Sequence, residues 1–190
     1  MIDKEYNKIL KQYHKLSDRH ILVAETDMPY SDVLKVVNLS DKIRKAGNEL
    51  IGLMRKNYDQ LMRTKRYRKL LFLYGNTEDK NKRRIYANQL NEMQKAYHVT
   101  WDYCRKSMIP IGKKYGIDAV FALTKAEDVW RGIEKCLYDN GNTIHFSKYG
   151  ELPCIRAKQI NRGIPMSVKD GELQFKLGKI AFGIKVNDRF

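Results

Sequence analysis

The sequence predicts an α+β protein, in which a helical body of about a hundred residues precedes a small antiparallel β module. Apolar residues recur at spacings of three and four as far as residue 141, and from residue 142 the period changes to two. A hydrophobic content of 43%, with 12 tyrosines and 6 phenylalanines, indicates a packed core. We therefore divide the chain into residues 1–39, 40–141 and 142–190.

The first part, residues 1–39, predicts an N-terminal helix and a short strand. Residues 2–16 form the helix, because one face collects Ile2, Tyr6, Ile9, Tyr13 and Leu16. The apolar run at 20–24 is expected to form the strand. A break at residues 28–29 then precedes a short helix that reaches residue 37, with residue 31 or 32 as its cap.

The longest helical pattern is expected to start at Ser40, whose hydroxyl can accept a hydrogen bond from an early backbone N–H group. Its apolar stripe consists of Ile43, Ala46, Leu50, Leu53 or Met54, Tyr58 and Leu61. The helix is expected to bend or break near residues 63–64. A second stripe, which consists of Tyr67, Leu70, Leu71 and Tyr74, follows and stops at residues 75–76, where Gly-Asn is a C-terminal signal.

Three further helices are expected before residue 142. One restarts at residues 77–79, where Thr77 is the capping residue and Glu78-Asp79 an acidic first turn, with a core face of Ile85, Leu90, Met93 and Tyr97. The next is capped by Thr100, directs residues 101, 104 and 108 inward, and is bent or ended by Pro110. The last is capped by Thr124 and ends at the Asn-Gly-Asn of residues 140–142. Its face consists of Val129, Trp130, Ile133 and Leu137.

The β module is expected to begin with short runs at 144–146 and 154–160. A hairpin follows, with strands at 166–168 and 173–177 and its turn at Asp170-Gly171. Residues 180–186 alternate as a further strand. Such a module is expected to be incomplete at residue 190.

Positive charge is concentrated in one window of a chain whose net charge is +15. Residues 55–84 hold eleven Lys and Arg against three acidic residues, a local excess of +8, with four tyrosines in or beside the window. Clustered cations favour a polyanion, because phosphates gain Coulomb attraction and release counterions. The alternative is a helix face that is merely solvated.

Three groups of residues are candidates for nucleic-acid binding. The first, expected to clamp phosphates, is Arg63, Lys65, Arg66, Tyr67, Arg68 and Lys69, for which a solubilising turn is the alternative. The second, expected on neighbouring helices, is Arg83, Arg84, Arg105 and Lys106. The third, on a stretch that alternates cations with small or apolar residues, is Lys148, Arg156, Lys158 and Arg162.

No catalytic, metal-binding or cofactor-binding pattern stands out in the sequence. Acidic residues are scattered, and there is no CxxC, no His pair at i and i+4, and no glycine-rich phosphate loop. We predict no metal, no cofactor and no catalytic residue, and we leave enzymatic activity open. The three cysteines are widely spaced and no apolar run could span a bilayer, so we expect a cytoplasmic protein with no membrane partner.

Four segments carry a resemblance to a known family: residues 39–48 (LSDKIRKAGN), 101–104 (WDYC), 123–131 (LTKAEDVWR) and 146–153 (FSKYGELP). They resemble the N-terminal half of TnpB-like proteins, which are transposon-encoded, RNA-guided nucleases of the transposase class and are similar to miniature type V CRISPR effectors. The resemblance covers residues 38–190. It implies a helical recognition lobe at 40–141 and an incomplete wedge-type β barrel at 142–190, with the opening wedge strand in the first part.

The resemblance also implies a function. In that family the lobe holds the guide–target heteroduplex and the wedge grips the guide RNA, whereas the RuvC-like nuclease domain and zinc ribbon normally follow at positions beyond residue 190. We therefore expect binding to structured RNA or an RNA–DNA heteroduplex without cleavage, through phosphate and 2′-OH contacts. The alternatives are a nuclease-derived regulator that binds duplex DNA, and an interaction protein that mimics the lobe and occupies a nuclease or its guide RNA.

Overall fold

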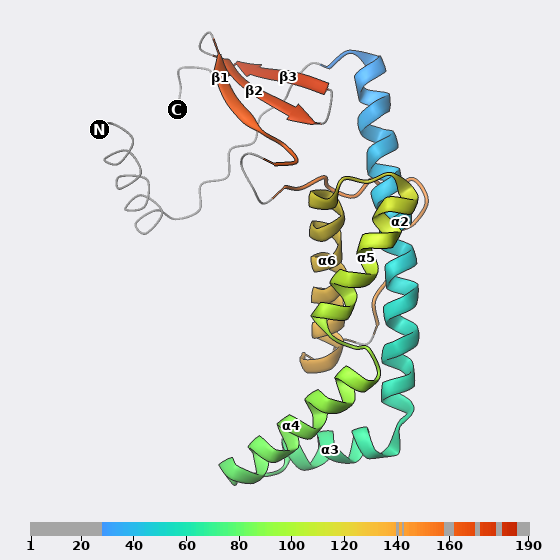
Figure 1. Ribbon diagram of the computed structural model, residues 1–190, viewed down its shortest axis with the longest axis vertical. Helices are drawn as coiled ribbons and strands as arrows, with labels where there is room; N and C mark the ends of the chain where they lie inside the picture. Colours follow the sequence, from blue (N-terminus) through green and yellow to red (C-terminus); the bar gives the residue numbers. More distant parts are fainter. Residues whose placement is uncertain are drawn as a thin grey trace, which may run out of the picture.

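The computed structural model describes residues 28–139, 141, 143–157, 162–169, 172–177 and 180–185. Within them the α+β prediction is confirmed, because five helices precede a three-stranded antiparallel sheet (Figure 1). The helix predicted at 2–16 and the strand predicted at 20–24 lie outside the described residues. None of the described helices is long and apolar enough to cross a membrane.

Helix α2 (Tyr30–Arg63) is a single helix of 34 residues. The predicted start at Ser40, and the separate short helix before it, are therefore wrong. The helix begins directly after Pro29, whose fixed backbone angle suits a helix start. Ser40 is buried inside the helix, and its hydroxyl donates a 2.8 Å hydrogen bond to the carbonyl oxygen of Pro153. Ser40 therefore forms a tertiary hydrogen bond instead of capping the helix.

Helices α5 (Trp101–Tyr115) and α6 (Ala119–Tyr138) pack against α2 and against each other, which gives a three-helix bundle (Figure 1). Leu50, Met54, Met108 and Ile133 are fully buried in its core. Cys104 lies in the same core, where burial raises the pKa of its thiol to about 12. The predicted cap at Thr100 is confirmed, since its side chain accepts a hydrogen bond from the N–H of Tyr103.

Two predictions about these helices are corrected. Of the two outcomes expected at Pro110, a bend or an end, the end is wrong, because α5 runs on to Tyr115 and is capped by Gly116 at a φ of +63°. The ring lies at an exposed position, where solvent can satisfy the carbonyl left without its N–H partner. Thr124 does not cap α6, because Asp118 caps it by accepting from the N–H of Val120 at 2.9 Å. The buried Thr124 hydroxyl instead donates to the carbonyl of Val120 at 2.9 Å.

Helices α3 (Lys65–Gly75) and α4 (Lys80–Ala96) pack against each other and lie across the end of α2, as Figure 1 shows. We call residues 65–96 the basic arm. The predicted break at residues 63–64 is confirmed by the extended backbone of Thr64. Two details are wrong: Asp79 rather than Thr77 caps α4, and Ile85 is 53% exposed instead of belonging to the core.

Residues 143–157 form no strand and lie along the bundle; we call them the strap. The short runs predicted at 144–146 and 154–157 are therefore wrong. Side chains hold the strap instead: Asn48 donates to the carbonyl of Ser147 and accepts from its N–H, both at 2.9 Å. These bonds satisfy backbone groups that a strand would pair within a sheet.

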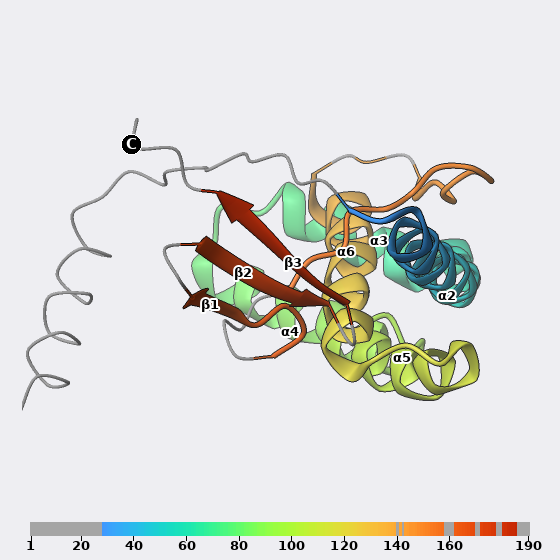
Figure 2. The same cartoon turned by 90° about the horizontal axis from the view of Figure 1, so that it is seen from above.

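The sheet has the order β1 (Met166–Lys169), β2 (Glu172–Leu177), β3 (Ile180–Lys185). Lys169 pairs with Glu172, so the two-residue hairpin predicted at residues 170–171 is confirmed by its register. Leu177 joins the main core. Figure 1 shows the sheet at the end of the molecule where α2 and α6 begin, opposite the basic arm, and Figure 2 shows it beside α6.

Candidate nucleic-acid interface

Residues 63–84, which include the corner with α2 and the first part of the basic arm, present nine exposed cations, which we call the arm cations. They are Arg63, Lys65, Arg66, Arg68, Lys69, Lys80, Lys82, Arg83 and Arg84. None of them forms an ion pair with any residue in the described ranges. Helix α3 carries no acidic residue, and the carboxylate of Asp79 accepts from the N–H groups of Asn81 and Lys82 at the start of α4.

Seven cations elsewhere in the described structure form ion pairs with acidic neighbours, whereas others, such as Lys42, Lys56 and Arg131, form none there. Asp102 on α5 pairs with Arg105 at 3.3 Å and with Lys106 at 2.7 Å, and the Lys106 and Arg105 side chains lower the pKa of Asp102. On α2, Asp41 likewise pairs with Arg44 and Lys45. The arm and its corner therefore hold the densest group of cations without an ion-pair partner among the described residues.

The corner between α2 and α3 contains an open hollow of about 480 Å³. It is lined by Asp59, Met62, Arg63 and Arg68. Two guanidinium groups on one concave surface can donate several hydrogen bonds to a phosphate, because each presents its N–H groups as a planar fork. The hollow thus joins the end of α2 to the cationic surface of α3.

The prediction that Tyr67 binds nucleic acid is wrong, because its side chain is only 1% exposed. Its hydroxyl oxygen accepts a 3.0 Å hydrogen bond from Gln94, and the Tyr138 hydroxyl donates to the same amide at 3.2 Å. Burial raises the pKa of Tyr67. These bonds join the arm to α6, and they leave the Tyr67 ring unable to stack on a base. The spacing to the apolar Leu70, three residues on, was the signal in the sequence that places Tyr67 inward.

The second predicted group is not brought together by the structure. Arg83 and Arg84 lie near the start of α4, where the Arg83 guanidinium stands 4.8 Å from the centre of the Tyr74 ring. Arg105 and Lys106 lie on α5 in the bundle, where both pair with Asp102. The first pair therefore belongs to the arm, and the second pair is a separate, partly neutralised surface.

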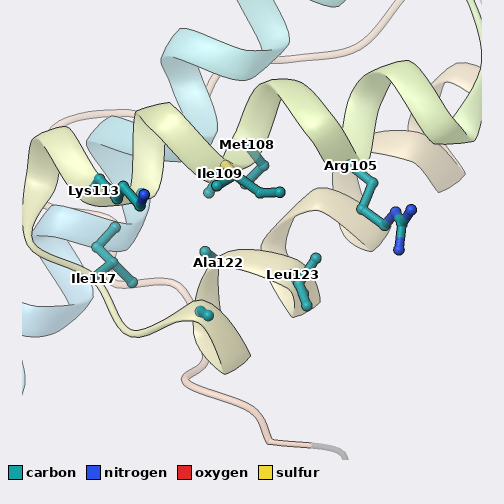
Figure 3. Close-up of a pocket in the computed structure, with 9 residues that line it drawn as sticks. Arg105, Met108, Ile109, Lys113, Ile117, Ala122 and Leu123 are labelled. Atoms are coloured by element: carbon teal, nitrogen blue, oxygen red, sulfur yellow. The ribbon is translucent and has the colours of Figure 1, made fainter.

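Arg105 instead borders an apolar groove between α5 and α6, which encloses about 450 Å³ (Figure 3). The groove is lined mainly by Met108, Ile109, Gly112, Ile117, Ala119, Ala122 and Leu123, with Arg105 and Lys113 at its rim. Aliphatic walls suit an apolar side chain better than a phosphate. A protein partner of the kind expected from the sequence would insert an apolar side chain into this groove.

The residues of the third predicted group differ in their surroundings. Arg156 pairs with Asp128 of α6, which raises the pKa of the guanidinium, so this cation ties the strap to the bundle. Lys148 and Arg162 are exposed, and Lys158 lies outside the described residues. Among the described members of this group, Lys148 and Arg162 therefore remain as free candidates.

Comparisons with known proteins identify no relative: no protein-family model matches, and neither does any curated protein or solved structure. The resemblance to TnpB-like proteins therefore stays a prediction. Within the described part of the chain, no group of three or more His, Cys, Asp or Glu side chains could hold a metal ion. The arrangement of the arm cations is what remains to support a function.

Proposed function

We propose that this protein binds nucleic acid through the basic arm, with a structured RNA or an RNA–DNA heteroduplex as its ligand. The observation that carries the proposal is that nine exposed cations on one two-helix arm and its corner have no acidic partner among the described residues. A phosphate backbone would supply the missing negative charge.

The residue types favour phosphate. Five of the nine arm cations are arginines, whose guanidinium forks match phosphate oxygens in a bidentate geometry. The contacts would be to backbone and sugar, so the arm would recognise the shape of the helix, and base pairing within the ligand would supply any sequence preference.

The proposal includes a guide-RNA-binding role related to transposition, as the TnpB-like resemblance implies, and a cytoplasmic location. It does not include cleavage. Duplex DNA is the alternative ligand, as expected for a nuclease-derived regulator. The three cysteines are free thiols, which is compatible with a reducing compartment.

A salt titration tests the proposal. We expect the logarithm of the association constant for a 20-base-pair RNA duplex to fall with log [KCl] at a slope of about −4 or steeper, because each neutralised phosphate contributes roughly −0.7 to −0.9. Fluorescence anisotropy between 50 and 400 mM KCl measures it. An RNA–DNA heteroduplex and a DNA duplex of the same length identify the preferred ligand. Affinity that does not change with salt would contradict the proposal.

A further inference from the structure

Phe72 is a large aromatic residue on the outer surface of the basic arm. Its side chain is 68% exposed, whereas Tyr67 and Leu70 of the same helix are buried against α4. Single exposed apolar residues are common on protein surfaces. Phe72 differs from such residues because cationic side chains share its face of the helix.

The period of the helix places Phe72 at the centre of the cationic face of α3. Successive residues turn by about 100°, so Phe72 projects opposite the midpoint between Tyr67 and Leu70. Lys65, Arg68 and Lys69 precede it by seven, four and three residues, which puts them on the same face within two turns. All three side chains are exposed and form no ion pair among the described residues.

Three other exposed or half-exposed aromatic rings have a cation against them, although the exposed Tyr30 and Tyr138 do not. Arg83 lies 4.8 Å from the centre of the Tyr74 ring, Arg55 lies 5.3 Å from that of Phe146, and Arg44 lies 5.6 Å from that of Tyr149. Within the described residues no such partner covers Phe72. Its ring therefore offers an open face beside three free cations.

We propose that Phe72 stacks on an unpaired nucleobase while Lys65, Arg68 and Lys69 hold the phosphates of the same strand. The inference rests on the proposed function and narrows the ligand to a nucleic acid with at least one base outside a helix, such as a bulge or a loop. In a fully paired duplex the base faces are covered by their neighbours, whereas an unpaired base can be stacked on an aromatic side chain.

Two RNA hairpins test the inference, each closed by a polyethylene glycol linker in place of a nucleotide loop. One has a fully paired stem, and the other carries a single unpaired adenosine in an otherwise identical stem. We expect Phe72→Ala to weaken binding of the bulged hairpin about 5- to 150-fold, which corresponds to 1–3 kcal/mol for one stacked base. Binding of the paired hairpin is expected to change less than about twofold, because its phosphate contacts remain. The salt slope should stay that of the wild type.

Two further variants make the result specific. Phe72→Trp keeps an aromatic face and is expected to retain binding of the bulged hairpin. Ile85→Ala removes the other exposed apolar side chain of the arm, at 53% exposure on α4, and is expected to leave both affinities unchanged.

Several outcomes would overturn the inference. Equal losses on both hairpins would show a contact that does not depend on an unpaired base, and no loss on either would show that the ring makes no contact. Sedimentation of a wild-type dimer that Phe72→Ala dissociates without RNA would assign the ring to a second copy of the chain. In each case a steep wild-type salt slope would leave the proposed phosphate binding in place, whereas a flat slope would remove that as well.

Discussion

Replacing Lys65, Arg66, Arg68 and Lys69 together by alanine is expected to reduce the RNA association constant about 10³-fold at 0.1 M salt. Each cation on a phosphate contributes roughly 0.7 to 0.9 to the salt slope, so four of them account for a slope of about 3. Extrapolated from 0.1 M to 1 M salt, where the electrostatic contribution vanishes, that slope corresponds to three orders of magnitude. Anisotropy titrations of the variant at several KCl concentrations measure both quantities.

A matched variant separates the position of the charges from their number. Lys35, Lys45, Lys106 and Lys114 are four exposed lysines outside the arm, and each is paired with an acidic side chain at 2.6 to 2.8 Å. Replacing these four by alanine removes the same charge, but we expect the salt slope to change by less than about 1. If the two quadruple variants lost affinity equally, the ligand would respond to net charge alone, and the arm would not be the site.

Tyr67→Ala is expected to destabilise the protein by about 3–5 kcal/mol, the range for truncating a large buried aromatic residue. The ring is 1% exposed, and its loss would leave a cavity where α3 meets α4. It would also remove the hydrogen bond that Gln94 donates. Urea unfolding followed by circular dichroism measures the loss of stability, and amide hydrogen exchange in the arm shows whether the arm opens first.

Tyr67→Phe keeps the ring and removes only the hydroxyl. We expect a loss of about 1–3 kcal/mol, since Gln94 is 7% exposed and its amide would lose an acceptor. RNA affinity should stay within about twofold of the wild type. A variant of unchanged stability that bound RNA tenfold more weakly would contradict the buried position of Tyr67 and return it to the binding surface.

The helices of the arm and the β hairpin could be predicted because local signals determine them. An apolar period of three to four and a Gly-Asn stop locate α3 and α4, and Asp-Gly locates the turn between β1 and β2. Helix starts at Ser40 and Thr124 were wrong because a hydroxyl serves equally as a cap or as an internal donor. Only the folded chain shows that Ser40 donates to Pro153, 113 residues away.

The strap shows a further limit of periodicity. Its alternating residues suggested strands, because any extended segment with one side against a core alternates in this way. Its backbone groups pair with the side chain of Asn48 instead of a neighbouring strand. No local pattern in residues 143–157 predicts that partner.

The candidate site was predicted in its position but not in all its members. The run at 63–69 does lie on an exposed helix and its corner, yet the inward turn of Tyr67 follows from helical period alone. Asp102, three residues before Arg105 and four before Lys106, was visible as a counterion for both. The pairing of Arg156 with Asp128 could not be predicted from the sequence, because it joins the strap to α6 across 28 residues of chain.

Lysine acylation with and without RNA tests most directly whether the basic arm is the nucleic-acid interface. Mass spectrometry of the protein at saturating RNA is expected to show protection of Lys65, Lys69, Lys80 and Lys82, the four lysines among the arm cations. The paired lysines outside the arm, Lys35, Lys45, Lys106 and Lys114, are expected to react equally in both samples. Protection of this second set, with the arm lysines still reactive, would contradict the proposed interface.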